Sequence, residues 1–275
     1  MHHVMLKGGG RMPALGLGTY RLTGAEGLRA IRTALEIGYR HLDTAAAYGN
    51  EAEVGRAVRE SGIDRADLFV TTKVWMDRAR AAEVRASADE SLGRLGMDYV
   101  DLLLFHWPAG HVPLAETLGG LMAVKTAGKA RAIGVSNFPV ALMREAVECT
   151  GGDIACNQIE YHVGLRQTAV LDEARRHGIV VTAYSPLGKG DIIDDPVLAR
   201  IGARHGKSAA QVALRWLVQQ DGVAAIPRSR SEANLRANLD IFDFRLSPGE
   251  MAAVSGLGGT NRMVNPSWAP DWDPA

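Results

Sequence analysis

Four residues in three short stretches of the sequence carry side chains that can move a proton together. Asp43 and Tyr48 lie five positions apart in RHLDTAAAYGNE, Lys73 ends the run TTK, and His106 follows DLLLF. A carboxylate, a phenol, an ammonium and an imidazole in one partly dry cavity would form a proton-delivery device. Spacing alone does not bring Asp43 and Tyr48 together, because five residues along a helix turn through about 500°. The two side chains meet only if Asp43 ends a strand and Tyr48 lies on the loop after it.

The chemistry of such a set follows from the ordinary properties of its members. A phenol with a pKa of about 10 donates its proton poorly at neutral pH. A neighbouring Lys73 ammonium favours the phenolate, so we expect it to lower the pKa of Tyr48. Asp43 would keep Lys73 charged and oriented, since a buried ammonium without a partner tends to lose its proton. His106 would hydrogen-bond a substrate carbonyl and polarise it.

The elements that must position these residues can be predicted from the apolar pattern. Eight runs have the length and composition of buried strands: residues 14–19, 39–44, 67–73, 99–106, 130–136, 154–160, 179–185 and 222–227. Seven segments between them repeat apolar residues near i, i+3, i+4 and i+7: residues 24–38, 50–62, 78–96, 113–129, 138–151, 166–178 and 208–222. Many of these segments end on glycine, as helices tend to. The alternation indicates a parallel sheet that is covered by helices.

Eight strand and helix units in about 250 residues fit a closed (β/α)8 TIM barrel of the α/β class better than an open doubly wound sheet. An open dinucleotide-binding sheet should carry G-x-G-x-x-G after its first strand. The run GLGTYRLTG has Gly16 and Gly18, but Tyr20 and Arg21 stand where the pattern would continue. No solenoid-type repeat or linker interrupts the chain. We therefore expect a single domain over residues 1–275.

In a barrel of this kind the chemistry lies where strands end and the following loops begin. Asp43 with Tyr48, Lys73 and His106 then belong to three neighbouring strands and can converge on one mouth of the barrel. Further polar residues stand at the other predicted strand ends: Ser136, Asn137, Gln158, Glu160, Tyr184, Ser185, Arg228 and Ser229.

The composition gives no sign of a nucleic acid, a membrane or a metal as partner. Thirty-one basic side chains balance 31 acidic ones, so no net charge attracts a polyanion. No apolar run has signal-peptide length or approaches the roughly 20 residues of a membrane span. Cys149 and Cys156 are too few for a disulfide framework, so we expect a cytoplasmic protein. His41, Asp43 and His106 lack another obvious carboxylate for a metal site, and we expect none.

Seven motifs, in order over nearly the whole chain, resemble those of the aldo-keto reductase family. They are GYRHLDTAAAYGNE (38–51), TTKVW (71–75), LGMDYVDLLLFHWP (95–108), GKARAIGVSNF (128–138), CNQIEYH (156–162), TAYSPLGKG (182–190) and IPRSRSEANLRAN (226–238). The resemblance implies a (β/α)8 barrel that reduces carbonyls with a nicotinamide cofactor. It implies Tyr48 as proton donor, with Asp43, Lys73 and His106 completing the catalytic set. By length and short loops the chain is most similar to the bacterial branch that includes diketogluconic acid and methylglyoxal reductases.

The same resemblance implies a set of cofactor-binding residues. Ser136, Asn137 and Gln158 would hold the carboxamide of the nicotinamide, and Tyr184 would stack on its ring. The cofactor set also includes Gly18, Thr19, Ser185, Leu187, Arg228, Ser229, Asn234 and Asn238, with Ser185 and Leu187 covering the pyrophosphate.

The adenosine end departs from the family pattern. Arg228, Ser229 and Asn238 fit members that prefer NADP, but Asn234 stands where a second arginine is usual. An arginine suits a 2′-phosphate because its planar fork donates two hydrogen bonds at once. Arg228 supplies one fork, and Arg230 is a candidate for reaching the same place. We expect NADPH as cofactor, with NADH also possible.

Large aromatic residues near the predicted rim are expected to line the substrate pocket: Tyr20, Trp75, Trp107 and Trp268. The C-terminal stretch 258–275 is too irregular for a helix, and we expect it to fold across the mouth as one wall of that pocket. We expect a monomer that reduces a small carbonyl compound. The alternatives are a dehydrogenase working mainly from alcohol to carbonyl, and a cofactor-binding barrel that senses redox state with incidental turnover. A binding module, however, has no use for a phenol tuned as an acid.

Overall fold

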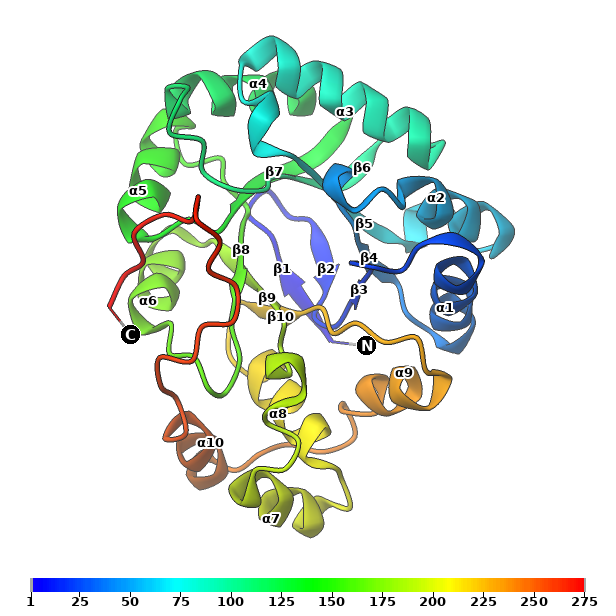
Figure 1. Cartoon of the computed structure of the whole chain (residues 1–275), viewed down its shortest axis with the longest axis vertical. Coiled ribbons are helices and arrows are strands. Elements are labelled where there is room, and N and C mark those ends of the chain that lie inside the picture. The colour runs from blue at the N-terminus through cyan, green and yellow to red at the C-terminus, as the bar shows by residue number, and fades with distance from the viewer. Residues whose placement is uncertain (1, 275) are drawn as a thin grey trace.

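Eight parallel strands follow one another in chain order around a central axis (Figure 1). They are β3 (Leu17–Gly18), β4 (His41–Asp43), β5 (Phe69–Val74), β6 (Val100–Phe105), β7 (Ala130–Ser136), β8 (Cys156–Glu160), β9 (Val180–Tyr184) and β10 (Val223–Ala225). This computed structural model describes residues 2–274. A parallel bridge between Leu15 and Ala225 joins the first strand to the last and closes the sheet. The predicted (β/α)8 barrel is confirmed.

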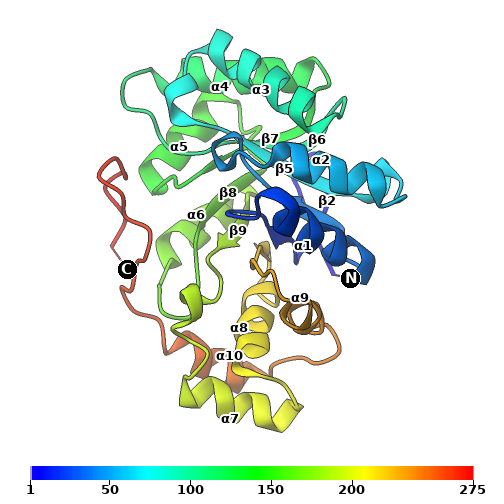
Figure 2. The same ribbon diagram turned by 45° about the vertical axis from the view of Figure 1, so that its right-hand side comes forward.

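Within residues 2–274, ten α-helices surround or flank this barrel. They are α1 (Gly24–Ile37), α2 (Glu51–Glu60), α3 (Ala81–Leu95), α4 (Leu114–Thr126), α5 (Val140–Cys149), α6 (Thr168–His177), α7 (Pro196–His205), α8 (Ala209–Val218), α9 (Glu232–Leu239) and α10 (Pro248–Ser255). All seven predicted helical segments are present. The helices α7, α9 and α10 are additional to those predicted, and Figure 2 shows α7 and α10 beside α8 at one end of the molecule.

A short antiparallel hairpin, also not predicted, precedes the barrel. It pairs β1 (His3–Met5) with β2 (Arg11–Pro13) through a turn in which Gly8 and Gly9 have φ angles of 89° and 92°. The carbonyl oxygen of Pro13 lies 3.2 Å from Nδ1 of His41, the first residue of β4. The hairpin therefore covers the N-terminal ends of the strands, away from the end where chemistry is expected.

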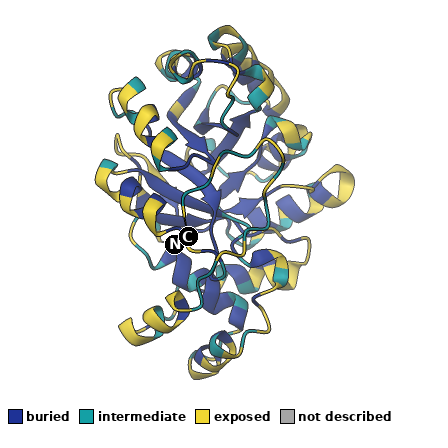
Figure 3. Ribbon diagram, turned by 60° about the vertical axis from the view of Figure 1, so that its left-hand side comes forward, coloured by how far each residue is buried: buried dark blue, intermediate teal, exposed yellow. Residues whose placement is uncertain are grey.

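The core lies inside the barrel and between the strands and the helices (Figure 3). Every residue of β4, β5, β8 and β10 is buried, as expected for parallel strands that are covered on both faces. Gly18 ends β3 where the first and last strands meet. A Cβ at this position would lie 2.7 Å from the carbonyl oxygen of Ile226, so only glycine permits this approach.

Residues 256–274 form no helix or strand, and this segment runs along one side of the barrel mouth (red in Figures 1 and 2). An isolated bridge pairs Thr260 with Leu165 at its beginning. Among the residues described, no helix has both the length and the apolar character that crossing a membrane requires.

Candidate active site

The four predicted proton-transfer residues come together at the C-terminal ends of three adjacent strands. Asp43 is the last residue of β4, Lys73 lies near the end of β5, and His106 directly follows β6. Tyr48 ends the 3-10 turn η1 (Ala46–Tyr48) on the loop after β4. Its ring centroid lies 5.6 Å from that of His106 and 5.1 Å from Nζ of Lys73. The loop conformation that the opening motif required is therefore present.

Lys73 is fully buried and holds the carboxylate of Asp43 beneath Tyr48. Its Nζ donates to Oδ1 of Asp43 at 2.5 Å and to the carbonyl oxygen of Thr44 at 2.8 Å. Burial lowers the pKa of Lys73, while the charge and hydrogen bond of Asp43 oppose that change. The second carboxylate oxygen of Asp43 accepts from Nε2 of Gln158 at 2.7 Å. Both oxygens are thus occupied, which fixes the orientation of the ion pair.

The pKa of Tyr48 does not follow the prediction. Burial raises the pKa of Tyr48 well above 10.0, and the negative charge of Asp43 and the neighbouring Tyr20 raise it further. The prediction that Lys73 lowers the pKa of Tyr48 is wrong. The ammonium of Lys73 donates its hydrogen bonds to Asp43 and Thr44, and it faces the ring of Tyr48. Tyr48 therefore keeps its proton at neutral pH.

His106 is a neutral imidazole on the other side of the phenol. Burial and the charge of Lys73 lower the pKa of His106 well below 6.5. Its Nδ1 is buried and has no hydrogen-bond partner among residues 2–274. A buried donor without an acceptor is costly, so the single ring proton belongs on Nε2. The edge of the ring packs against Trp75, with centroids 5.1 Å apart.

The loop that carries Tyr48 is held by two buried residues that the sequence analysis did not single out. Nδ2 of Asn50 donates to the carbonyl oxygens of Thr19 and Leu22, and its Oδ1 accepts from Thr44. Glu51 accepts from Thr72 at 2.5 Å and from Arg94 at 2.7 Å. The sequence GNE after Tyr48 was the available signal for these two residues, because a polar side chain that is buried at the start of a helix needs hydrogen-bond partners.

A cavity of about 1860 Å³ opens above these groups at the mouth of the barrel. Of the residues predicted to take part in catalysis or binding, the following line it: Gly18, Thr19, Tyr20, Asp43, Tyr48, Trp75, His106, Trp107, Asn137, Gln158, Tyr184, Ser185, Leu187, Arg228, Ser229, Asn234, Asn238 and Trp268. Lys73 and Ser136 lie one layer behind the lining. Oγ of Ser136 donates to the carbonyl oxygen of Gln158 and accepts from Nδ2 of Asn137.

The backbone independently marks the same cavity as the functional site. Four residues other than glycine have positive φ angles in the described chain, namely Arg21, Asn137, Ser185 and Lys189. All four line the cavity. Strained backbone of this kind costs about 1–3 kcal/mol per residue and is found mainly at binding and catalytic sites.

The two ends of the cavity differ in chemistry. At one end the Tyr184 hydroxyl donates to Oδ1 of Asn137 at 2.7 Å, beside Gln158. At the other end lie Arg228 and Ser229 on the loop after β10, with Asn234 and Asn238 on α9. The predicted reach of Arg230 into this end is wrong, because its guanidinium donates to the carbonyl oxygen of Arg21 at 2.7 Å and does not line the cavity.

Aromatic residues form the rim of the cavity. The ring centroids of Tyr20 and Tyr48 lie 5.1 Å apart, and those of Trp75 and Trp268 lie 6.4 Å apart. Tyr20 is 52% exposed and Trp268 is 48% exposed, so both aromatic side chains are open to solvent at the cavity. Residues 263–266, which belong to the C-terminal stretch predicted to form one wall of the pocket, line the cavity together with Trp268.

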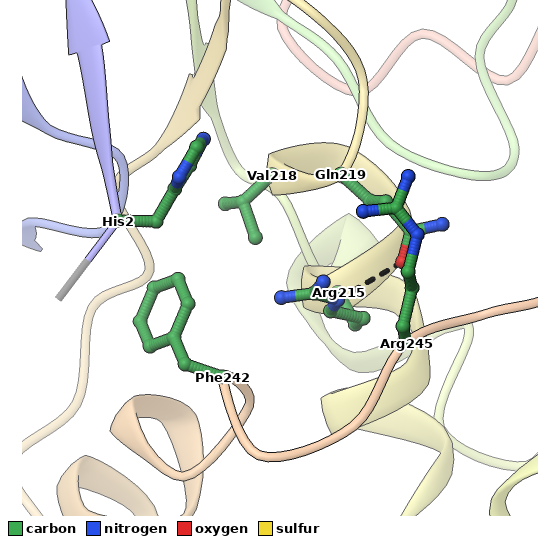
Figure 4. Close-up of a pocket in the computed structure, with 6 residues that line it drawn as sticks. All are labelled: His2, Arg215, Val218, Gln219, Phe242 and Arg245. Atoms are coloured by element: carbon green, nitrogen blue, oxygen red, sulfur yellow. Dashed lines mark hydrogen bonds between the residues drawn. The ribbon is translucent and has the colours of Figure 1, made fainter.

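A second cleft, of about 390 Å³, lies at the opposite end of the barrel (Figure 4). It is lined by His2, Arg215, Val218, Gln219, Phe242 and Arg245. The guanidinium of Arg215 donates through Nε to the side-chain oxygen of Gln219 at 3.0 Å. None of the proton-transfer residues is near it, so the chemistry belongs to the cavity at the mouth.

Fold and site together define a barrel enzyme with a buried acid and base set. Residues 14–258 match the Aldo/keto reductase family. An aldo-keto reductase of Mycolicibacterium vanbaalenii is 44% identical over 261 residues, which cover 94% of this chain and 93% of that protein. Methylglyoxal reductase DkgB of Escherichia coli O157:H7 is 41% identical over 266 residues, with 95% and 99% covered.

Solved structures agree with these relatives. One described as "a putative 2,5-diketo-D-gluconic acid reductase B" is 53% identical, with a TM-score of 0.97 over 100% of this chain and 98% of that one. A Bombyx mori aldo-keto reductase in complex with NADP is 33% identical, with a TM-score of 0.91 over 98% and 97% of the two chains. The chain belongs to the aldo-keto reductase family. It is an oxidoreductase of carbonyl groups, and NADPH is the cofactor typical of that family.

Proposed function

We propose that this enzyme reduces small aldehydes, ketones or dicarbonyls to alcohols with NADPH, with Tyr48 as the general acid. The observation that carries the proposal is the fully buried Asp43–Lys73 pair beneath the phenol of Tyr48, beside a neutral His106. Because one relative is a methylglyoxal reductase, small dicarbonyls are the first substrates to consider.

The chain's own residues account for binding, orientation and proton delivery. The Nε2 hydrogen of His106 donates to the substrate carbonyl oxygen, which fixes its direction and polarises the bond. Tyr48 gives its proton to that oxygen as negative charge develops there, and the Lys73 ammonium beneath it stabilises the phenolate that remains. NADPH, when bound, supplies the hydride to the carbonyl carbon. Asp43 keeps Lys73 charged throughout, as a buried ammonium requires.

The donor groups of the cavity fit a nicotinamide dinucleotide. Asn137 and Gln158 offer amide groups at the catalytic end, where a carboxamide needs both a donor and an acceptor. Tyr184 lies beside them as a stacking surface, and Ser185 and Leu187 also line the cavity. Arg228 and Ser229 offer a guanidinium and a hydroxyl at the far end, which suit a 2′-phosphate.

The test is a fluorescence titration of the purified protein with NADPH and with NADH, followed by absorbance assays with methylglyoxal, an aromatic aldehyde and a keto-sugar. We expect tight NADPH binding and oxidation of NADPH with at least one carbonyl. Binding without turnover on every carbonyl would favour the redox-sensing alternative, and the absence of binding would contradict the proposal.

The proposal extends to the state in which the enzyme works, which is a single-domain monomer in the cytoplasm. One cluster of buried apolar residues runs from the N-terminal hairpin to α10, as a single cooperative unit requires. Both cysteines are free thiols, which fits a reducing compartment. Sedimentation and a single thermal transition test the oligomeric state and the single domain.

A further inference from the structure

A buried carboxylate at the end of β8 has no part in the proton chemistry described above. Glu160 is the last residue of β8 and is fully buried, and it does not line the cavity. Its Oε1 accepts from the backbone amide of Met263 at 2.7 Å, and its Oε2 accepts from that of Val264 at 2.9 Å. One side chain of the barrel thus binds two consecutive amides of the C-terminal segment.

His162 completes the surroundings of this carboxylate. Its Nδ1 accepts from the backbone amide of Gly164 at 3.2 Å, so its ring proton lies on Nε2, which is 3.1 Å from Oε1 of Glu160. Burial would raise the pKa of Glu160, but the hydrogen bonds from His162, Met263 and Val264 outweigh it and hold that pKa below 4.5. Glu160 is therefore an ionised carboxylate that three N–H donors stabilise.

The segment that Glu160 binds has little structure of its own. Residues 261–274 form no helix or strand, so their position depends on contacts with the barrel. The carbonyl oxygen of Met263 accepts from Nζ of Lys189, which belongs to the strained turn η4 (Gly188–Gly190) at the cavity. The peptide groups around Met263 are thus held by Glu160 on one side and by Lys189 on the other.

The same few residues form part of the wall of the active-site cavity. Met263, Val264, Asn265 and Pro266 line it together with Trp268, whose ring contacts Trp75 beside His106. A shift of the peptide at residues 263 and 264 would move this wall relative to Tyr48 and His106. Among residues 2–274, the hydrogen bonds of the Glu160 carboxylate go to His162, Met263 and Val264, and none goes to Arg228, Ser229 or α9 at the adenosine end of the cavity.

We propose that Glu160, supported by His162, is a positioning residue for substrate: its carboxylate fixes residues 263–266 as a wall of the substrate pocket. The proposal rests on the carbonyl-reductase function proposed above. Loss of the carboxylate should then weaken the binding of carbonyl substrates while leaving the binding of NADPH unchanged. Loss of a residue that only stabilises the fold would not weaken the binding of carbonyl substrates selectively while leaving the binding of NADPH unchanged.

The test begins with Glu160→Gln, whose single amide oxygen cannot accept from all three donors. We expect the KM for carbonyl substrates to rise about tenfold, in line with the loss of hydrogen bonds to a charged group. We expect kcat and the Kd for NADPH to change by less than about twofold.

Trypsin should also cut faster after Arg262, which in the wild type is packed against the Trp272 ring at 3.8 Å. His162→Gln, which keeps the carboxylate, should produce a smaller change in the same direction.

The matched control is Glu173→Gln, because Glu173 is a buried carboxylate of α6 whose partners are Arg144, Arg176 and His177. It should leave both the KM and the cleavage after Arg262 unchanged. In a chain that ends at Asn261, Glu160→Gln should raise the KM no further, since the wall it positions is gone. An unchanged KM in the full-length variant, or an added rise in the shortened chain, would overturn the proposal. If the wild type reduces no carbonyl, the proposed function fails, and the cleavage rates still test whether Glu160 holds the segment.

Discussion

The proton chemistry of this site depends on how the charge of Lys73 is shared between Asp43 and Tyr48. The hydrogen bonds of Lys73 go to Asp43 and to the backbone of Thr44, and its ammonium lies 5.1 Å from the centre of the Tyr48 ring. With a pKa raised by burial, Tyr48 is protonated before the reaction. The ammonium of Lys73 then acts as the phenolate forms. It therefore stabilises the transition state and not the resting enzyme.

Tyr48→Phe should remove the proton donor and leave the shape of the site intact. We expect kcat for carbonyl reduction to fall by about 10²–10⁴-fold, the usual contribution of a positioned general acid. The Kd for NADPH should stay unchanged, because the hydroxyl belongs to the substrate side of the cavity. Absorbance assays and a fluorescence titration measure both quantities. Tyr20→Phe, at the rim beside Tyr48, is the control and should keep most of the activity; a fully active Tyr48→Phe enzyme would exclude this role.

Arg228 should decide between NADPH and NADH. Its guanidinium is the one fork predicted to meet a 2′-phosphate, since Arg230 is bound to Arg21 and position 234 is an asparagine. Arg228→Ala should raise the KM for NADPH by about tenfold or more and leave the KM for NADH nearly unchanged. Asn234→Arg should shift the preference further toward NADPH. Equal effects of Arg228→Ala on the two cofactors would contradict the assignment.

At the scale of elements, the sequence predicted those parts that repeat a strong pattern. The eight strands and seven of the helices were predicted because buried parallel strands and amphipathic helices have distinct periods. The hairpin of β1 and β2 was missed because three-residue strands are too short for a period. The helices α7 and α10 did carry signals, namely Asp195 before Pro196 and the sequence Ser247-Pro248-Gly249-Glu250.

The site could be predicted in part for the same reason. Asp43, Lys73 and His106 stand at strand ends, where barrel topology itself implies convergence. The hydrogen-bond partners of Asn50, Glu51 and Glu160 could not be predicted, because they are as far away in the sequence as Thr19, Arg94 and Val264. The direction of the Tyr48 pKa was wrong because burial outweighs a charge that is already paired with Asp43.

The ion pair that joins α5 to α6 should make the free energy of unfolding decrease at acid pH. Glu173 binds Arg144 of α5, and the pKa of Glu173 falls from 4.5 to about 2, with the hydrogen bond from Arg144 as the largest cause. Because the pKa is lowered on folding, this contribution is fully present above 4.5 and is lost as the pH falls toward about 2. Glu173→Gln should therefore lower the urea midpoint at pH 7 and flatten its decline between these pH values.

Glu60→Gln provides the comparison for that measurement. Glu60 also pairs with arginines, Arg32 and Arg56, but on the exposed surface of α2. Exposed ion pairs contribute little, so this variant should retain the urea midpoint and the acid decline of the wild type. A Glu173 variant with the same acid decline as the wild type would show that the ion pairs of α6 do not govern acid unfolding.

At the scale of the whole molecule, the cavity gathers residues from nearly the full length of the chain. Gly18 lies at its beginning, Tyr48 and His106 in its first half, and Asn238 and Trp268 near its end. The unfolded chain cannot present these groups together. A cofactor that bridges the catalytic end and the α9 end therefore binds only the folded barrel, and its binding free energy adds to the stability of the fold.

NADPH should accordingly raise the melting temperature. At a concentration of 100 times its Kd the cofactor contributes about 2.7 kcal/mol, which corresponds to a rise of about 5–8 °C for a chain of this size. A thermal shift assay should show a larger rise with NADPH than with NADH at equal concentration. Arg228→Ala should lose most of this difference, whereas Arg245→Ala, in the cleft at the opposite end of the barrel, should keep it. Equal shifts for both cofactors in the wild type would show that the 2′-phosphate is not recognised, and no shift with either would contradict the assignment of the cavity.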